Sequence, residues 1–244
     1  FTKHVTAALA LKMVEDGKLN LSTKAHSIID PFLLRTAAQR AAPLNFTSLE
    51  SIWGEQANDI TVEHLGRMQS GIPDDYVDNG LYTDGLSEPA HVFGPFELIY
   101  KSKGFPLTFP PGSDAKYSTL GFAVLGLALC ALQEGCDTAD EIDILAWAPS
   151  HLRKALIATK FAMSGTPRCF SRLHACELLS GPLHSDVFNL AATFAGYTGA
   201  FMAAPASNAA QLVYAINSPH TAYLSNESRR LMQQSTKGHS RADY

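Results

Sequence analysis

The sequence has little charge and no large excess of either sign. Asp, Glu, Lys and Arg make up 17% of its 244 residues, and the net charge at pH 7 is -4. A nucleic-acid-binding domain gathers its basic side chains into a patch or stripe, but here the 19 Lys and Arg residues are scattered. Nucleic acid is therefore not an expected partner. Because 46% of the residues are hydrophobic, the chain can bury the core of an ordinary globular domain.

The sequence also lacks a hydrophobic run long enough to cross a membrane. Its most apolar stretch is LGFAVLGLALCAL, residues 120–132. Crossing a bilayer as a helix takes roughly 20 apolar residues. This shorter stretch therefore predicts a buried helix, in which Gly121 and Gly126 allow neighbouring helices to pack closely.

Cysteine is scarce, and its spacing matches no metal or redox motif. The four cysteines form two sequence pairs, Cys130 with Cys136 and Cys169 with Cys176. Neither pair has C-x-x-C spacing, and the histidines show no H-E-x-x-H pattern. The sequence therefore predicts no metal and no cofactor. Cys130 is expected in the core, either as a free thiol or in a local disulfide if the protein is exported.

Three N-x-S/T sequons begin at Asn20, Asn45 and Asn226. Such short motifs also arise by chance, so alone they support a secretory protein only modestly. Together with the cysteine pairs they favour the secretory pathway, while a cytosolic or organellar location stays open.

Helical spacing of apolar residues dominates the chain. Residues 4–16 predict a helix, and Gly17 is a typical residue for its end. A second helix is expected from Thr61, as its N-cap, to Gly71, where Pro73 blocks any continuation. Helices are also expected over residues 140–161, 171–194, 207–217 and 225–234, the last with Ser225 as its N-cap.

Between these helices the sequence predicts loops. The segment after Leu21 holds Pro31 and Pro43, and residues 74–116 are rich in Gly, Pro and Asp without a sustained period. There is no internal repeat and no alternating strand of convincing length. The expected fold class of this chain is therefore mostly α.

Three stretches, in a fixed order, carry a family resemblance. They are TKHVTAALALKMVEDGKLNLS from residue 2, ITVEHLGRMQSGIPD from residue 60, and FPPGSDAKYSTLGFAVLG from residue 109. Together they resemble the serine β-lactamase and penicillin-binding protein family, in its class C and esterase-type branch. The resemblance covers residues 1–130. Residues 207–232 more loosely resemble the two helices that precede the last motif of that family.

The nucleophile motif of this family is S-x-x-K, and Phe1-Thr2-Lys3 supplies its last three positions. The resemblance therefore implies a serine directly before Phe1. Positions three apart on a helix share a face, so the lysine amine would lie beside the serine hydroxyl. A serine needs a base to take its proton, and a lysine can do so where burial and neighbouring charge keep it partly neutral. The alternative is that Lys3 is an ordinary surface lysine.

Tyr117 and Thr119 match the first and third positions of the family's Y-x-N motif. The resemblance implies that Tyr117 exchanges protons with the nucleophile and the leaving group, helped by a lysine cation. The alternative is a tyrosine that packs its ring and hydrogen-bonds a helix end. Thr119 departs from the motif, because a hydroxyl lacks the paired donor and acceptor of the asparagine that contacts lysine and substrate. This difference disfavours β-lactams more than it disfavours acyl transfer.

The third motif of the family, K-T-G or H-x-G on a strand beside the nucleophile, is not found. Residues 236–238 hold its letters in the wrong order, residues 164–166 and 239–241 do not match, and loops are expected at all three places. GHSRA at 238–242 imitates the G-x-S-x-G elbow of α/β-hydrolases, but no apolar strand precedes it. His64 is expected to pack or to form a local hydrogen bond.

The resemblance predicts one β-lactamase-like domain over residues 1–244, truncated at both ends, in which most of the central antiparallel sheet of the α/β fold is missing. The implied parent protein is a serine hydrolase that acts on a small ester, amide or peptide through an acyl-enzyme. This chain alone is expected to be inactive, because it lacks the nucleophile and the oxyanion strand. The alternative is a non-catalytic scaffold for binding or assembly, which Thr119 and the missing motifs favour.

Overall fold

The computed structural model describes residues 2–38, 46–74, 99–133, 206–221 and 223–234. Its helices are α1 (Thr2–Glu15), α2 (Ala25–Ala38), α3 (Leu49–Trp53), α4 (Val62–Gly66), α7 (Thr119–Ala131), α10 (Ala206–Asn217) and α11 (Asn226–Gln233), with a 3-10 helix, η1, at Glu55–Asp59. In these ranges no strand forms, and Lys24 and Thr61 make an isolated antiparallel bridge. The prediction of a mostly helical chain is confirmed.

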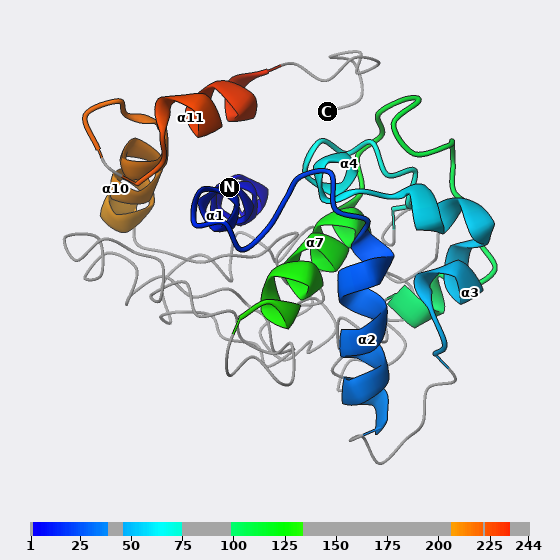
Figure 1. The fold of residues 1–244 in the computed structure, drawn as a ribbon. Helices are drawn as coiled ribbons and strands as arrows, with labels where there is room; N and C mark the ends of the chain where they lie inside the picture. Colours follow the sequence, from blue (N-terminus) through cyan, green and yellow to red (C-terminus); the bar gives the residue numbers. More distant parts are fainter. Residues whose placement is uncertain (1, 39–45, 75–98, 134–205, 222, 235–244) are drawn as a thin grey trace, which may run out of the picture.

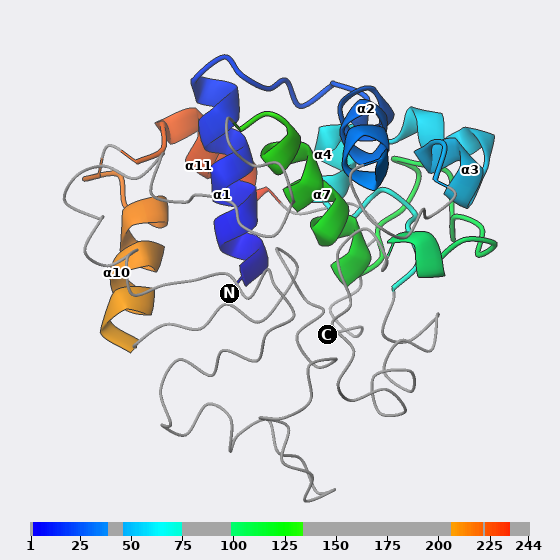
Figure 2. The ribbon, with the colours of Figure 1, turned by 90° about the horizontal axis from the view of Figure 1, so that it is seen from below.

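Helix α7 lies at the centre of this arrangement. It is hydrophobic on all sides, and every residue from Thr119 to Cys130 is buried. A helix of this kind has to be covered all round. Helices α1, α2 and α4 each pack against it, and Figures 1 and 2 show α7 (green) between α1 and α2. The predicted buried helix is therefore confirmed.

Helix α1 buries most of its length against α7 and α11. It ends before Gly17, which adopts a φ of 69° and lets the chain turn, as its sequence predicted. Helix α11 begins with Ser225 as its N-cap, whose side chain accepts a hydrogen bond from the backbone N–H of Ser228. In both ribbon views α10 lies on the side of α1 that faces away from α7 (Figures 1 and 2).

The prediction of a loop around Pro31 is wrong, because this proline lies inside α2. An internal proline costs a helix about 3 kcal/mol. However, α2 buries Ile29, Phe32 and Leu33 and packs against α7. Fully burying a large apolar side chain contributes about 1.5–3 kcal/mol, so three of them outweigh the proline.

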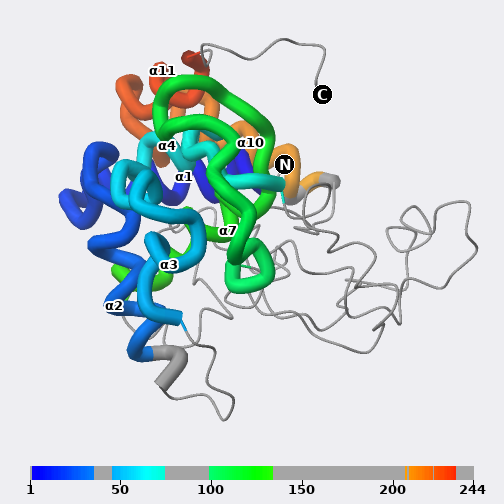
Figure 3. The backbone as a smooth tube through the Cα atoms, turned by 90° about the vertical axis from the view of Figure 1, so that its right-hand side faces the viewer, coloured from blue at the N-terminus to red at the C-terminus, as the bar shows by residue number. Residues whose placement is uncertain are grey.

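The helix predicted from Thr61 to Gly71 is also wrong in length, because α4 ends at Gly66. Beyond it the backbone carbonyls bond to the loop that leads into α7. Thr108 N donates to Gly71 O at 2.8 Å, Gly112 N to Gln69 O at 2.8 Å, and Lys116 N to Met68 O at 3.0 Å. Figure 3 shows this loop (green) beside α4. These long-range bonds replace the bonds that a longer helix would make.

Cys130 is buried in α7 and is disulfide-bonded, and the other three cysteines lie outside the described residues. None of the helices described here combines the length and the hydrophobicity that a bilayer span needs. The helices predicted over 140–161 and 171–194, and the motif-like segments at 164–166 and 236–242, also lie outside the described residues.

Candidate active site

Lys3 lies in the first turn of α1, and its partly buried side chain reaches the start of α7. Its Nζ donates a hydrogen bond to the Tyr117 hydroxyl at 2.8 Å and another to Thr119 Oγ1 at 3.4 Å. These partners are 114 and 116 positions away along the chain. The fold thus brings together the three residues that the family motifs single out.

Two aromatic rings lie close to the Lys3 ammonium. Its Nζ is 4.5 Å from the centroid of the Tyr117 ring and 5.8 Å from that of Phe122. Both distances are within the range in which a cation is attracted to a ring face. Phe122 is 3% exposed, whereas Tyr117 is 36% exposed. The Lys3 amine is therefore shielded from solvent on the side of Phe122 and accessible to solvent on the side of Tyr117. The motifs did not identify Phe122, although it lies one helical turn after Thr119.

The start of α7 is fixed by a cap, which sets the position of Thr119. Ser118 is the N-cap, and its Oγ accepts a hydrogen bond from Gly121 N at 2.9 Å. The same hydroxyl donates to Pro73 O at 3.3 Å. It therefore ties the S-G-I-P segment to the helix that follows Tyr117. Thr119 is the first residue of α7 and is 3% exposed.

His64 supports the turn that leads to Tyr117. Its Nδ1 accepts a hydrogen bond from Thr61 N at 3.3 Å, and its own N–H donates to Thr61 Oγ1 at 3.2 Å, which forms a capping box on α4. The ring also packs on Gly112, where an added Cβ would lie 2.8 Å from His64 Nε2. Burial lowers the pKa of His64 below its ordinary value of 6.5. The predicted local hydrogen bond of His64 is thus confirmed.

His4 joins the candidate site to α10. Its Nε2 lies 2.9 Å from Asn217 Nδ2, which also donates to Val213 O at 2.8 Å. Because Nδ2 of an amide is a donor, His4 accepts through Nε2. Burial lowers the pKa of His4 below 6.5, which keeps its ring in the accepting form. No sequence motif pointed to this pair.

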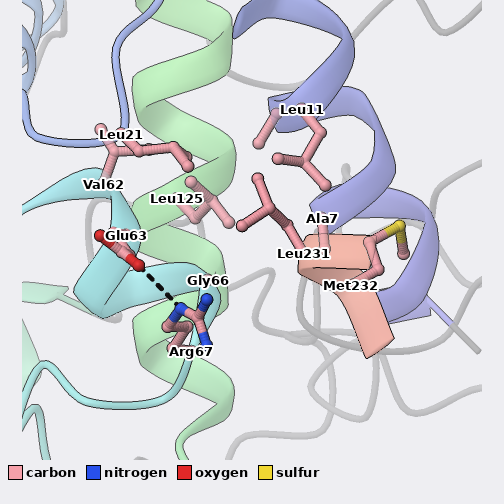
Figure 4. A pocket seen from close by; sticks show the side chains of 11 residues that line it. Ala7, Leu11, Leu21, Val62, Glu63, Gly66, Arg67, Leu125, Leu231 and Met232 are labelled. Atoms are coloured by element: carbon pink, nitrogen blue, oxygen red, sulfur yellow. Dashed lines mark hydrogen bonds and ion pairs between the residues drawn. The ribbon is translucent and has the colours of Figure 1, made fainter. Parts of the chain in front are cut away.

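A separate apolar pocket of about 70 Å³ lies between α1, α4, α7 and α11, as Figure 4 shows. Most of its wall is aliphatic, and at one edge Arg67 Nε pairs with Glu63 Oε1 at 2.8 Å. Its lining includes neither Lys3 nor Tyr117, and it carries no hydroxyl or thiol. We therefore place the candidate chemistry at the Lys3–Tyr117 pair and not in this pocket.

The chemical capacity of the site follows from its groups. An amine and a phenol in direct hydrogen-bond contact can pass a proton between them and return it. In the part of the chain that the structure describes, no group of three His, Cys, Asp or Glu residues could hold a metal ion. The arrangement can therefore serve as the proton-transfer half of an acyl-transfer site.

Comparisons with known proteins show a family and a fold for this chain. A model of the Beta-lactamase family matches residues 1–153. The fold is similar to that of a D-stereospecific amidohydrolase from Streptomyces sp., with a TM-score of 0.62 and 18% identity over 94% of this chain and 62% of that one. It is also similar to EstCE1, a hydrolase with promiscuous acyltransferase activity, with a TM-score of 0.59 and 18% identity over 96% of this chain and 61% of that one. No curated protein sequence matches. The chain spans about three fifths of the length of these two structures.

Proposed function

Because this chain belongs to the beta-lactamase family, as its first 153 residues show, we propose that it is part of a serine hydrolase. In this proposal the enzyme cleaves an ester or an amide through an acyl-enzyme. The observation that carries it is the 2.8 Å hydrogen bond from Lys3 Nζ to the Tyr117 hydroxyl, because it joins two family motifs that are far apart in sequence. The family resemblance seen in the three motifs is confirmed.

Each residue has a defined role in the proposed reaction. A serine three positions before Lys3 attacks the substrate carbonyl, and its hydroxyl proton passes to the neutral amine form of Lys3 or, when the Tyr117 hydroxyl is deprotonated, to its phenolate through Lys3. The pair returns that proton to the departing alkoxide or amine. A water molecule then gives up a proton by the same route and releases the acyl group. Thr119 holds the Lys3 amine through the 3.4 Å contact.

The proposed substrate class is a small ester or amide, peptides included. The solved structures with this fold include one called an amidohydrolase and one called a hydrolase with acyltransferase activity. Those names support acyl transfer but select no substrate for this chain. Thr119 stands where the family motif has asparagine, and its single hydroxyl oxygen lacks the separate donor and acceptor groups with which a carboxamide can pair with a substrate amide. We therefore place β-lactams last among the candidates.

The test uses the complete product of the reading frame and a fluorophosphonate probe, which labels an activated serine. We expect labelling of the wild-type protein, and a loss of at least about 100-fold in its rate for Lys3→Met, since general-base catalysis contributes at least that much. Lys12→Met is the matched control, because Lys12 is on the same helix but pairs with Glu15 at 3.4 Å and Asp16 at 3.1 Å. Equal labelling of both variants would refute the role of Lys3.

The second candidate function is a non-catalytic scaffold that uses the same fold for binding or assembly. Thr119 favours it, because this position departs from the catalytic motif. The same probe separates the two functions. A complete, folded protein with no labelled serine and no ester hydrolysis would support the scaffold and reject the enzyme.

We also propose that residues 1–244 form a single domain. Contacts between its distant ends support this: Ser225 N donates to Glu15 Oε1 at 2.7 Å, and Asn217 bonds to His4. A single cooperative unfolding transition, with the same midpoint by fluorescence and by circular dichroism, is the expected result.

A further inference from the structure

Asn20 lies in the turn between α1 and α2 and begins the sequon Asn20-Leu21-Ser22. Both Asn20 and Ser22 are exposed. The side-chain carbonyl of Asn20 accepts two hydrogen bonds from Ser22, one from its backbone N–H at 2.9 Å and one from its hydroxyl at 2.8 Å. We propose that Asn20 is an N-glycosylation site whose side-chain amide carries an oligosaccharide.

The turn brings together the side-chain amide of Asn20 and the hydroxyl of Ser22, the two groups that the sequon supplies. A hydroxyl that donates to an amide carbonyl draws electrons from it and makes the attached nitrogen easier to deprotonate. In the proposed step, Asn20 Nδ2 attacks C1 of the first sugar of a lipid-diphosphate-linked oligosaccharide. The C–N bond forms as the bond from C1 to the diphosphate oxygen breaks. The amide proton goes to a base of the transferase, and the lipid diphosphate leaves.

The sequon at Asn226 is held in a different way. Asn226 Oδ1 accepts a hydrogen bond from Arg229 Nη2 at 2.7 Å, whereas Asn20 Oδ1 accepts from the hydroxyl of its own sequon. That hydroxyl belongs to Ser228, which is 4% exposed and lies 3.3 Å from Ser225 Oγ within the cap of α11. The structure therefore favours Asn20 over Asn226. The first residue of the third sequon, Asn45, lies outside the described residues.

Two further observations favour this site. Cys130 is disulfide-bonded, and disulfides persist in oxidising compartments, which include the one where lipid-linked oligosaccharides are transferred to protein. Asn20 and Ser22 are also both exposed, so the Asn20 amide is accessible to a transferase. Lys3 lies near the opposite end of α1. At 1.5 Å per residue, that puts the glycan about 20 Å from the candidate site.

The test is peptide mapping of the complete protein purified from its own cells. Peptide N-glycosidase F in ¹⁸O-water turns a glycosylated asparagine into an ¹⁸O-labelled aspartate. Trypsin then releases the peptide Leu19–Lys24, because Lys18 and Lys24 flank it. We expect the ¹⁸O label on Asn20 and unlabelled asparagine at Asn226. A Leu19–Lys24 peptide with unmodified asparagine before enzyme treatment would overturn the proposal.

Matched variants separate loss of the glycan from loss of the fold. Expressed in the same cells, Asn20→Gln and Ser22→Ala are expected to migrate as the deglycosylated protein does. Ser22→Thr keeps the hydroxyl and is expected to retain the glycan. Asn226→Gln is expected to migrate as the wild type. A mobility change in Asn226→Gln together with an unchanged Asn20→Gln would assign the glycan to the other sequon and overturn the proposal.

Discussion

At the scale of single residues, the candidate site depends on one side chain, the amine of Lys3. It is held by the hydroxyls of Tyr117 and Thr119 and by the rings of Tyr117 and Phe122. A lysine side chain has many rotamers, and each added contact narrows them. Tyr117 restricts the Lys3 rotamers through two contacts, one from its hydroxyl and one from its ring. Its hydroxyl can therefore be removed while the ring contact stays.

The first prediction concerns Tyr117→Phe. This change keeps the ring contact of 4.5 Å and removes the hydroxyl that accepts from Lys3. We expect kcat/KM for an ester substrate of the complete protein to fall by about 10²–10⁴, the usual contribution of a general acid or base. Because Tyr117 is 36% exposed, the free energy of unfolding is expected to change by no more than about 0.5 kcal/mol.

The control for this prediction is Tyr214→Phe. Tyr214 lies on α10 and is 59% exposed. Its substitution therefore also removes a phenol hydroxyl from an exposed tyrosine. Unchanged activity in both variants would show that the Tyr117 hydroxyl takes no part in the reaction.

The second prediction compares two glycines with similar backbone angles. Gly71 has a φ of 75°, and a Cβ there would collide with the backbone oxygen of Phe109. Gly17 has a φ of 69°, and a Cβ there would meet no atom within 4 Å. Gly71→Ala is expected to destabilise the protein by about 2–4 kcal/mol, from backbone strain plus the collision. Gly17→Ala should cost about 1 kcal/mol, from strain alone. Urea unfolding measures both, and equal losses would contradict the role of the Phe109 contact.

At the scale of elements, short helices hold the site because their ends are capped. Helix α4 has five residues, too few to be stable alone. Its N-terminus is closed by the reciprocal bonds of Thr61 and His64, and the backbone after it pairs with the loop before Tyr117. Cap and loop together therefore determine where Tyr117 lies.

The third prediction tests this cap with Thr61→Ala. Loss of an N-cap hydroxyl costs about 1 kcal/mol, with a range of about 0.5–2. We expect a lower midpoint of urea unfolding and an unchanged slope. Thr61→Ser, which keeps the hydroxyl, should remain within about 0.5 kcal/mol of the wild type. If the serine variant lost as much stability as the alanine variant, the hydroxyl would not be the stabilising group.

At the scale of the whole molecule, α7 unites segments from distant parts of the chain. Helices α1, α2 and α4 come before it in sequence, and α10 and α11 reach the assembly through α1. Two histidines at such contacts, His4 and His64, are partly buried, and burial lowers the pKa of each. Stability should therefore depend on pH near neutrality.

The fourth prediction gives the sign of that dependence. In the unfolded chain a histidine has its ordinary pKa of 6.5, above its lowered value in the fold. Between these two values the unfolded chain binds more protons, so the free energy of unfolding rises with pH. We expect the contribution of these histidines to stability to be fully present above about pH 7 and to decrease as the pH falls below 6.5 and through their lowered pKa values. The pKa of Glu15 is lowered from its ordinary value of 4.5. Its effect on stability therefore appears at a lower pH than the effect of the histidines.

The matched variant for this prediction is His64→Gln. Glutamine at this position can close the same capping box but does not titrate. Its stability at pH 7.5 should match the wild type, and its stability should fall less steeply between about pH 7 and 5. Urea unfolding at several pH values measures this. If the free energy of unfolding of the variant falls with pH as steeply as that of the wild type, His64 does not contribute to the pH dependence.

Local sequence signals predicted the features that depend on interactions between neighbouring residues. Gly17 ends α1, Ser225 caps α11 and Thr61 caps α4, because caps depend on a few neighbouring residues. The burial of α7 was predictable because its apolar residues cover every side. The motifs pointed to Lys3, Tyr117 and Thr119, which the structure brings into contact. The roles of these three residues stay predictions.

The sequence by itself determined the family, the helical character, the end of α1 and the N-caps of α4 and α11, since these depend on residue type and short-range order. Only the tertiary structure decided that α2 continues through Pro31, that α4 stops at Gly66, and that Lys3 lies 2.8 Å from the Tyr117 hydroxyl. Each of these depends on contacts between segments far apart in the chain. Burial against α7 outweighs the proline, and hydrogen bonds to the loop before Tyr117 replace the last turn of α4. Local propensity does not contain those energies.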